Sequence, residues 1–178
     1  KLEEVAANPF LAAKRRPLVV GHRGVPRLHQ ENTLAGFRRA AELGIPAVEL
    51  DVRLTRDGHS VVVHDPDLYR LAGHSRAVSD LTAHALSQVR LRREVRSGID
   101  GNGAVVIQRY ETAEPIPLFA EVLAEITGKV VINVELKLDF QPWWPIEIGA
   151  VAAPLCRQDC GEDRGNVTSF DVRKRPEA

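Results

Sequence analysis

The sequence predicts an α/β protein built on a parallel sheet that is either open or closed into a barrel. Apolar stretches with the two-residue period of a strand alternate along the chain with stretches that have the period of an amphipathic helix. Charged side chains stand at the ends of several predicted strands, where α/β proteins commonly place their binding groups. The fold and the function are therefore expected to meet at the same strand ends.

The composition is that of an ordinary globular domain. The chain has 178 residues, of which 44% are hydrophobic and 27% charged, enough for one domain with a substantial core. We expect a single domain over residues 1–178 with an insertion at about 66–103. Lysine and arginine together number 24, as do aspartate and glutamate, so no overall basic field favours nucleic acid or an anionic membrane as a partner. Any anion site must be local.

The sequence shows neither a membrane span nor an export signal. No apolar stretch reaches the roughly 20 residues of a span, so stable membrane insertion is not expected. Residues 1–17 lack the basic-then-apolar order of a signal peptide. These features favour a cytoplasmic location, and a secreted form whose signal had been removed would show the same sequence. Nothing in the sequence indicates an oligomeric state.

The first predicted unit is a short strand followed by a helix. Residues 19–24, VVGHRG, form an apolar run that ends in His22 and Arg23 as a loop begins. Residues 33–43, TLAGFRRAAEL, place their apolar side chains on one helical face and stop before Gly44. This helix is expected to pack on the sheet.

A strictly alternating strand comes next. Residues 47–55, AVELDVRLT, alternate apolar and polar side chains, and Asp-Gly at 57–58 is a strong turn signal before the strand of residues 60–65. If this turn closes a simple two-stranded hairpin, Asp51 lies opposite His64. A tight parallel crossover is the alternative.

The second half of the chain repeats the alternation of strand and helix. Between residues 66 and 103 the chain is polar and rich in arginine, and we interpret this segment as an excursion from the main sheet. The remaining predicted elements are a helix at about 80–92, a strand at 104–108, a helix at 118–128, a strand at 129–137, a helix at about 146–160 and a strand at 167–170.

Carboxylates break the apolar pattern of two of these strands. Glu49 and Asp51 are two residues apart and so share one face, and Glu135 has the matching late position in a later strand. A single acid on a strand is most often salt-bridged on a solvated face. Three acids at the carboxyl ends of parallel strands argue otherwise, because burying a carboxylate costs several kcal/mol unless a positive charge balances it. Carboxylate oxygens favour Ca²⁺ or Mg²⁺ as that charge.

Cations and imidazoles accompany these acids at the strand ends. The first strand ends in His22 and Arg23, Lys137 lies two residues beyond Glu135, and His64 ends a third strand, apart from those that carry the acids. A metal and two cations could stabilise the charge on a pentacoordinate phosphorus, and two histidines could serve as acid and base. The set is therefore suited to the cleavage of a phosphodiester.

These residues lie in motifs that resemble the glycerophosphodiester phosphodiesterase family. The matching stretches are GHRG at 21–24, ENT at 31–33, ELDVRLTRDG at 49–58, VVVHDPDL at 61–68, DLT at 80–82, IPLFAEVL at 116–123, NVELK at 133–137 and TSFD at 168–171. Their order and spacing fit the family over most of the chain. The resemblance implies a TIM-type (β/α)₈ barrel with an insertion after the third strand.

The resemblance also implies an activity, hydrolysis of a small-molecule glycerophosphodiester to glycerol 3-phosphate and an alcohol. It implies the following roles: His22 and His64 as the acid/base pair; Glu49, Asp51 and Glu135 as ligands of a divalent cation, Ca²⁺ or Mg²⁺; Arg23 and Lys137 as phosphate contacts. The resemblance further implies that the 2-hydroxyl of the glycerol can itself attack phosphorus. The sequence does not say which histidine takes the first proton.

The chain departs from the family pattern in its length. A TIM barrel usually needs about 250 residues, whereas this sequence stops soon after TSFD, near the expected fifth barrel strand. The resemblance therefore implies a barrel that is incomplete at the carboxyl-terminal end of this chain, and we expect the biological protein to be longer.

The sequence is also compatible with two other functions. One is a lysophospholipase D or sphingomyelinase D type lyase that forms a cyclic phosphate, and another is a non-catalytic phosphate-binding module. Glu31 and Asn32 either cap the helix that follows or help to fix the metal side of the pocket. Asp65 is expected to orient a neighbour or turn the chain rather than to bind metal.

Overall fold

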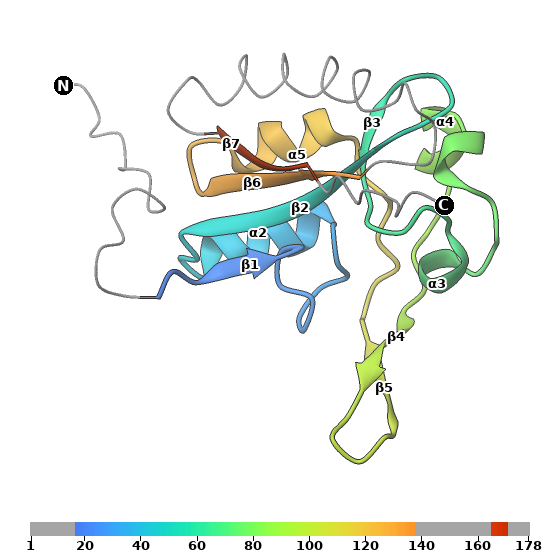
Figure 1. The fold of residues 1–178 in the computed structure, drawn as a ribbon, viewed down its shortest axis with the longest axis horizontal. Helices are drawn as coiled ribbons and strands as arrows, with labels where there is room; N and C mark the ends of the chain where they lie inside the picture. The colour runs from blue at the N-terminus through green and yellow to red at the C-terminus, as the bar shows by residue number, and fades with distance from the viewer. Residues whose placement is uncertain (1–16, 138–164, 171–178) are drawn as a thin grey trace, which may run out of the picture.

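The computed structural model describes residues 17–137 and the backbone of residues 165–170. Its main sheet contains parallel strands in the order β1 (Val20–His22), β2 (Ala47–Leu54), β6 (Val131–Leu136) and β7 (Gly165–Phe170). Figure 1 shows them side by side, with β1 in blue and β7 in red. The predicted parallel sheet is thus confirmed, and the carboxyl ends of its strands lie at one edge.

Two helices cover one face of this sheet. They are α2 (Leu34–Glu42) and α5 (Phe119–Ile126), and the hydroxyl of Thr33 caps α2 by accepting a hydrogen bond from the amide of Gly36. Phe37 and Phe119 from these helices are fully buried in one core with Leu50 of β2. Because strand side chains alternate, the polar residues of β2 face the opposite side of the sheet.

The third strand runs antiparallel to its neighbour. β3 (Ser60–Val62) pairs with the end of β2, so the predicted hairpin is confirmed and the crossover is not. The predicted register is wrong by one residue, because Val52 faces Val62 and the amide of Val63 donates to the carbonyl of Asp51 at 2.9 Å. Asp51 is therefore not opposite His64.

The physical reason for this shift lies in the turn. The amide of Thr55 donates to the carbonyl of His59 at 2.9 Å, and the hydroxyl of Thr55 accepts from the amide of His59. Three residues, rather than the two that Asp57-Gly58 suggested, therefore form the loop, with Gly58 at φ 77° as three-residue hairpins require.

The segment between β3 and α5 forms a second unit with its own apolar cluster, which includes Leu68, Leu71 and Leu86. Its elements are α3 (Tyr69–Ala72), a 3₁₀ turn (Val78–Asp80), α4 (Ala83–Ser87), β4 (Glu94–Ile99) and β5 (Val105–Arg109). The antiparallel β4–β5 hairpin extends away from the main sheet in Figure 1. The predicted extent of the insertion, about 66–103, stays a prediction.

In this segment one predicted helix is shorter than expected and one strand was missed. The helix predicted at about 80–92 begins only after Thr82 and ends at Ser87, because the chain beyond it pairs with the returning segment, where the amide of Leu91 donates to the carbonyl of Glu114. The strand β4 was not predicted. With small changes of boundary, the structure confirms the helix predicted at 118–128 and the strands predicted at 104–108, 129–137 and 167–170. The helix predicted at about 146–160 lies outside the described residues.

Within the part of the chain that the structure describes, no helix has the length and apolar character needed to cross a bilayer.

Candidate active site

A tight turn at the end of β1 places the first two candidate residues. The amide of Arg23 donates to both the backbone carbonyl and the Oε2 of Glu49, at 2.9 and 3.1 Å. Arg23 has φ 58°, in the left-handed region that costs a side-chain-bearing residue about 1–3 kcal/mol. Gly21 allows this turn, since a Cβ there would lie 2.7 Å from the carbonyl oxygen of Gly24. The turn thus holds Arg23 over the carboxylates of β2.

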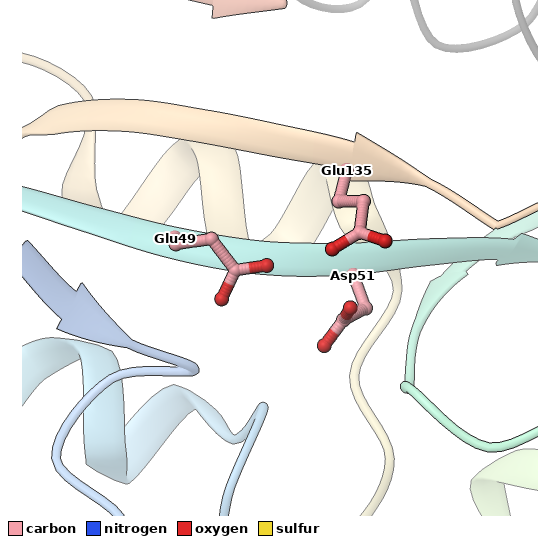
Figure 2. A group of neighbouring side chains, drawn as sticks. All are labelled: Glu49, Asp51 and Glu135. Carbon is pink, nitrogen blue, oxygen red and sulfur yellow. The ribbon is translucent and has the colours of Figure 1, made fainter. Parts of the chain in front are cut away.

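Three carboxylates from two strands gather beside this turn. Glu49 and Asp51 share a face of β2, and Glu135 lies directly opposite Asp51 on β6. Each offers an oxygen within 4.8 Å of the others. Figure 2 shows the three side chains from β2 and β6 brought together at the sheet. The parallel register of β2 and β6 therefore produces the cluster that the sequence predicted.

Two cations and an amide surround the carboxylate of Asp51, which is fully buried. Nε of Arg23 lies 3.2 Å from Oδ2 and Nζ of Lys137 lies 3.0 Å from Oδ1. The side-chain amide of Asn32 donates to Oδ2 at 2.8 Å. Lys137 also contacts Glu135. Both predicted phosphate contacts thus lie in the carboxylate cluster.

The donor set fits a hard divalent cation. Oε1 of Glu49 is buried and accepts no hydrogen bond, and the buried Oδ1 of Asp51 has the charge of Lys137 beside it but no hydrogen bond. Buried oxygens are normally hydrogen-bonded. Burial, together with the charge of Asp51, raises the pKa of Glu49 from its ordinary 4.5 to about 7. A cation bound between the three acids would satisfy the unbonded carboxylate oxygen and would stabilise the ionised form of Glu49. A set of carboxylate oxygens favours Ca²⁺ or Mg²⁺ as that cation.

His22 stands at the rim of the cluster. Its Nε2 lies 3.7 Å from Oε2 of Glu49, while 69% of its side chain is exposed. Partial burial and the charge of Arg23, with a weaker contribution from His64, lower the pKa of His22. This shift favours the neutral imidazole, which can accept a proton.

His64 is held from two directions just after β3. Its Nδ1 lies 2.8 Å from Oδ1 of Asp65, and its backbone carbonyl accepts two hydrogen bonds from the guanidinium of Arg53, at 2.9 and 2.7 Å. A carboxylate at Nδ1 favours the tautomer with the proton on that nitrogen, which leaves Nε2 for chemistry. As the sequence suggested, Asp65 thus orients its neighbour.

Arg70 belongs to the site and was not predicted from the sequence. Its guanidinium donates two hydrogen bonds to Glu31, at 2.8 and 2.7 Å, and one to Asp65 at 2.7 Å. Glu31 in turn accepts from Nη1 of Arg23 at 2.9 Å. A continuous network therefore runs from Arg23 through Glu31, Arg70 and Asp65 to His64.

The network holds its acids in their ionised form. Burial opposes ionisation, but the hydrogen bonds and charge of Arg70 keep the pKa of Glu31 below its ordinary value. The pKa of Asp65 is likewise lowered, against burial, by its hydrogen bonds to His64 and Arg70. No periodicity or motif spacing marks Arg70, whose contact with Glu31 spans 39 positions of sequence.

The structure places every residue that the sequence analysis proposed for the site within this assembly. The cluster holds the three acids Glu49, Asp51 and Glu135, with Arg23 and Lys137 both paired to Asp51. His22 lies against Glu49, and His64 is joined to Arg23 through the network. For the pair before α2, the helix cap is Thr33, whereas Asn32 and Glu31 bind the site.

Comparisons with known proteins agree with this geometry. The model of the glycerophosphoryl diester phosphodiesterase family matches residues 22–143. A glycerophosphodiester phosphodiesterase of Caldanaerobacter subterraneus is 34% identical over 88% of this chain and 59% of the relative. One from Bacillus altitudinis is 33% identical over 67% of this chain and 44% of the relative. The chain therefore spans about half the length of these relatives.

Solved structures share the fold. A phosphodiesterase of Oleispira antarctica, solved in complex with the product sn-glycerol-3-phosphate, superposes with a TM-score of 0.65 at 26% identity, over 83% of this chain and 54% of that one. A glycerophosphodiester phosphodiesterase of Thermotoga maritima gives a TM-score of 0.56 at 28% identity, over 85% of this chain and 61% of that one. With the strand order, these matches confirm a TIM-type (β/α)₈ barrel of which this chain holds a part.

Proposed function

Because this chain belongs to the glycerophosphoryl diester phosphodiesterase family, we propose that it hydrolyses glycerophosphodiesters to glycerol 3-phosphate and an alcohol. One observation carries the proposal: three carboxylates, two cations and a histidine meet at the carboxyl ends of β1, β2 and β6. The product bound to the Oleispira antarctica relative supports glycerol 3-phosphate as the product here.

A divalent cation completes the proposed site. Glu49, Asp51 and Glu135 would hold Ca²⁺ or Mg²⁺ through their carboxylate oxygens. When bound, the cation supplies positive charge that polarises the phosphoryl group. It would also neutralise the like charges that raise the pKa of Glu49.

Arg23 and Lys137 are proposed to bind the phosphate. Their charged groups already flank Asp51 on opposite oxygens, at 3.2 and 3.0 Å, so both point into the same site. As a nucleophile adds to phosphorus, negative charge grows on the phosphoryl oxygens. Fixed cations stabilise that charge without reorganising, which is the most effective form of electrostatic catalysis.

His22 and His64 are proposed to move the protons. One removes a proton from the attacking hydroxyl, which is the glycerol 2-hydroxyl or a water, and the other protonates the alkoxide that leaves when its bond to phosphorus breaks. If the 2-hydroxyl attacks, water then opens the cyclic phosphate. The Asp65 carboxylate keeps Nε2 of His64 available for this transfer.

The test is product analysis with a substrate whose alcohol part is uncharged. Glycerophosphoglycerol would be incubated with the purified protein in Ca²⁺ or Mg²⁺, and the phosphorus products identified by ³¹P NMR. We expect glycerol 3-phosphate, and no turnover when EDTA replaces the metal. A cyclic phosphate as the final product would identify a lyase instead. Absence of turnover in both metals would overturn the proposal in favour of a phosphate-binding module.

A further inference from the structure

A cavity of about 480 Å³ lies beside the candidate active site. Its lining joins His22 and Arg23 to residues of the β4–β5 hairpin, among them Ser97 and Gln108. The volume falls in the range of small-molecule sites. It exceeds what a three-carbon glycerol needs, so the cavity has room for the other half of a phosphodiester.

The cavity is markedly basic. Four arginines line it, Arg23, Arg27, Arg70 and Arg96, against a single acid, Glu31. Glu31 is shared by Arg23 and Arg70, which also pair with Asp51 and Asp65. Arg27 and Arg96 are both exposed, and within residues 17–137 neither has a carboxylate at ion-pair distance. Two positive charges that line the cavity are therefore paired with solvent rather than with a carboxylate of the described residues.

Hydrogen bonds hold the two walls of this cavity together. The hydroxyl of Tyr110 donates to the carbonyl of Pro26 at 2.8 Å, and the side-chain amide of Gln108 donates to the carbonyl of Arg27 at 3.2 Å. At the base of the hairpin, buried Gln30 donates to the carbonyl of Arg92 and accepts from the amide of Glu114. A pocket fixed in advance loses little entropy when it binds a ligand.

We propose that this cavity receives the alcohol part of the substrate and that this alcohol carries an anionic group, such as a phosphate monoester. The inference rests on the proposed function and narrows its substrate class. In the proposed function, Arg23 and Lys137 balance the negative charge of the phosphodiester itself, and the glycerol is uncharged. Arg27 and Arg96 thus match a second anion, for which guanidinium groups are suited, and a cationic alcohol would be repelled.

The experiment compares two substrates that differ by one phosphate. The specificity constant kcat/KM would be measured for glycerophosphoglycerol and for glycerophosphoglycerol phosphate, in wild type, in Arg27→Gln, in Arg96→Gln and in the double variant. Arg109→Gln is the matched control, because Arg109 lies on the same hairpin, pairs with Glu94 in solvent and does not line the cavity.

We expect wild type to prefer the phosphorylated substrate by about tenfold or more, as one or two charge-assisted hydrogen bonds would give. The preference should fall in each single variant, vanish in the double variant and persist in Arg109→Gln. Equal kcat/KM for the two substrates in wild type, or a preference that survives in the double variant, would overturn the inference.

A binding measurement separates this inference from the proposed function. Dissociation constants of both compounds would be measured by calorimetry in the His64→Ala variant with Ca²⁺ present, where turnover is suppressed. Tighter binding of the phosphorylated compound, lost when Arg27→Gln and Arg96→Gln are added, supports the anionic pocket even if no enzyme turns over. Equal binding of both compounds contradicts it even if the protein hydrolyses glycerophosphoglycerol.

Discussion

The two halves of the candidate site are positioned by different means. On the carboxylate side, Glu49, Asp51 and Glu135 take their places from the register of two long parallel strands. On the histidine side, His64 follows a strand of only three residues. Its ring donates a hydrogen bond to the Asp65 carboxylate, and its backbone carbonyl accepts from the Arg53 guanidinium. The backbone therefore fixes where a cation would sit, while a side-chain network fixes one of the proton-transfer groups. A substitution in one half of the site should therefore impair that half and leave the other intact.

The largest expected effect is on the histidine side. In His64→Ala, turnover should fall by about 10²-fold or more, because a general acid or base is lost, while the affinity for Ca²⁺ stays close to that of wild type. Steady-state kinetics and calorimetry would measure the two quantities. His84→Ala, on the exposed face of α4, is the control and should change neither. Unchanged turnover in His64→Ala would remove this histidine from the mechanism.

The carboxylate side should respond to Glu49→Gln with a loss of cation affinity of roughly tenfold or more, because a neutral amide is a poorer ligand for a dication. Activity should fall with it and recover in part at high metal concentration. Glu42→Gln, an exposed glutamate at the end of α2, provides the matched control. If Glu49→Gln bound Ca²⁺ as tightly as wild type, the carboxylates would not form the cation site.

A smaller effect is expected from Arg70→Lys, which tests whether the network positions the histidine side. A lysine cannot donate to Glu31 and Asp65 in the forked geometry of arginine. We expect kcat to fall several-fold with little change in Ca²⁺ affinity. The control Arg109→Lys alters a solvent-exposed pair on the β4–β5 hairpin. A change in stability alone, with kcat intact, would show that Arg70 has only a structural role.

The smallest expected effect is a pH dependence of stability in the metal-free protein. Burial and Asp51 raise the pKa of folded Glu49 from 4.5 to about 7, so between these values the unfolded chain loses the proton first. The free energy of unfolding should therefore fall as pH rises from 4.5 to 7, by on the order of 1 kcal/mol more in wild type than in Glu49→Gln. Urea unfolding in EDTA at pH 5 and pH 8 measures this difference. Identical pH dependence in both proteins would contradict it.

The carboxylate side of the site could be predicted from the sequence because the two-residue period of a strand fixes which side chains share a face. Glu49, Asp51 and Glu135 break otherwise apolar strands at matching positions, and the regular parallel pairing of β2 with β6 brings them together. The same reasoning placed Arg23 and Lys137 beside them. The regular part of the fold, its parallel sheet and the helices α2 and α5, was predictable for the same reason.

The histidine side and the β4–β5 hairpin were less predictable because their geometry depends on long-range contacts. Arg70 acquires its role through Glu31, distant in sequence, and nothing local marks it. The residues of β4, EVRSGI, show no clear alternation and form a strand only because β5 returns beside them. The hairpin register was missed by one residue because Thr55 closes a three-residue turn.

The most direct test of the cation site is a crystal of the protein soaked in Mn²⁺, with anomalous scattering measured at the manganese edge. We expect a single strong peak between Glu49, Asp51 and Glu135, within coordination distance of all three carboxylates. A difference map without a peak there, or with the manganese bound elsewhere in the barrel, would contradict it.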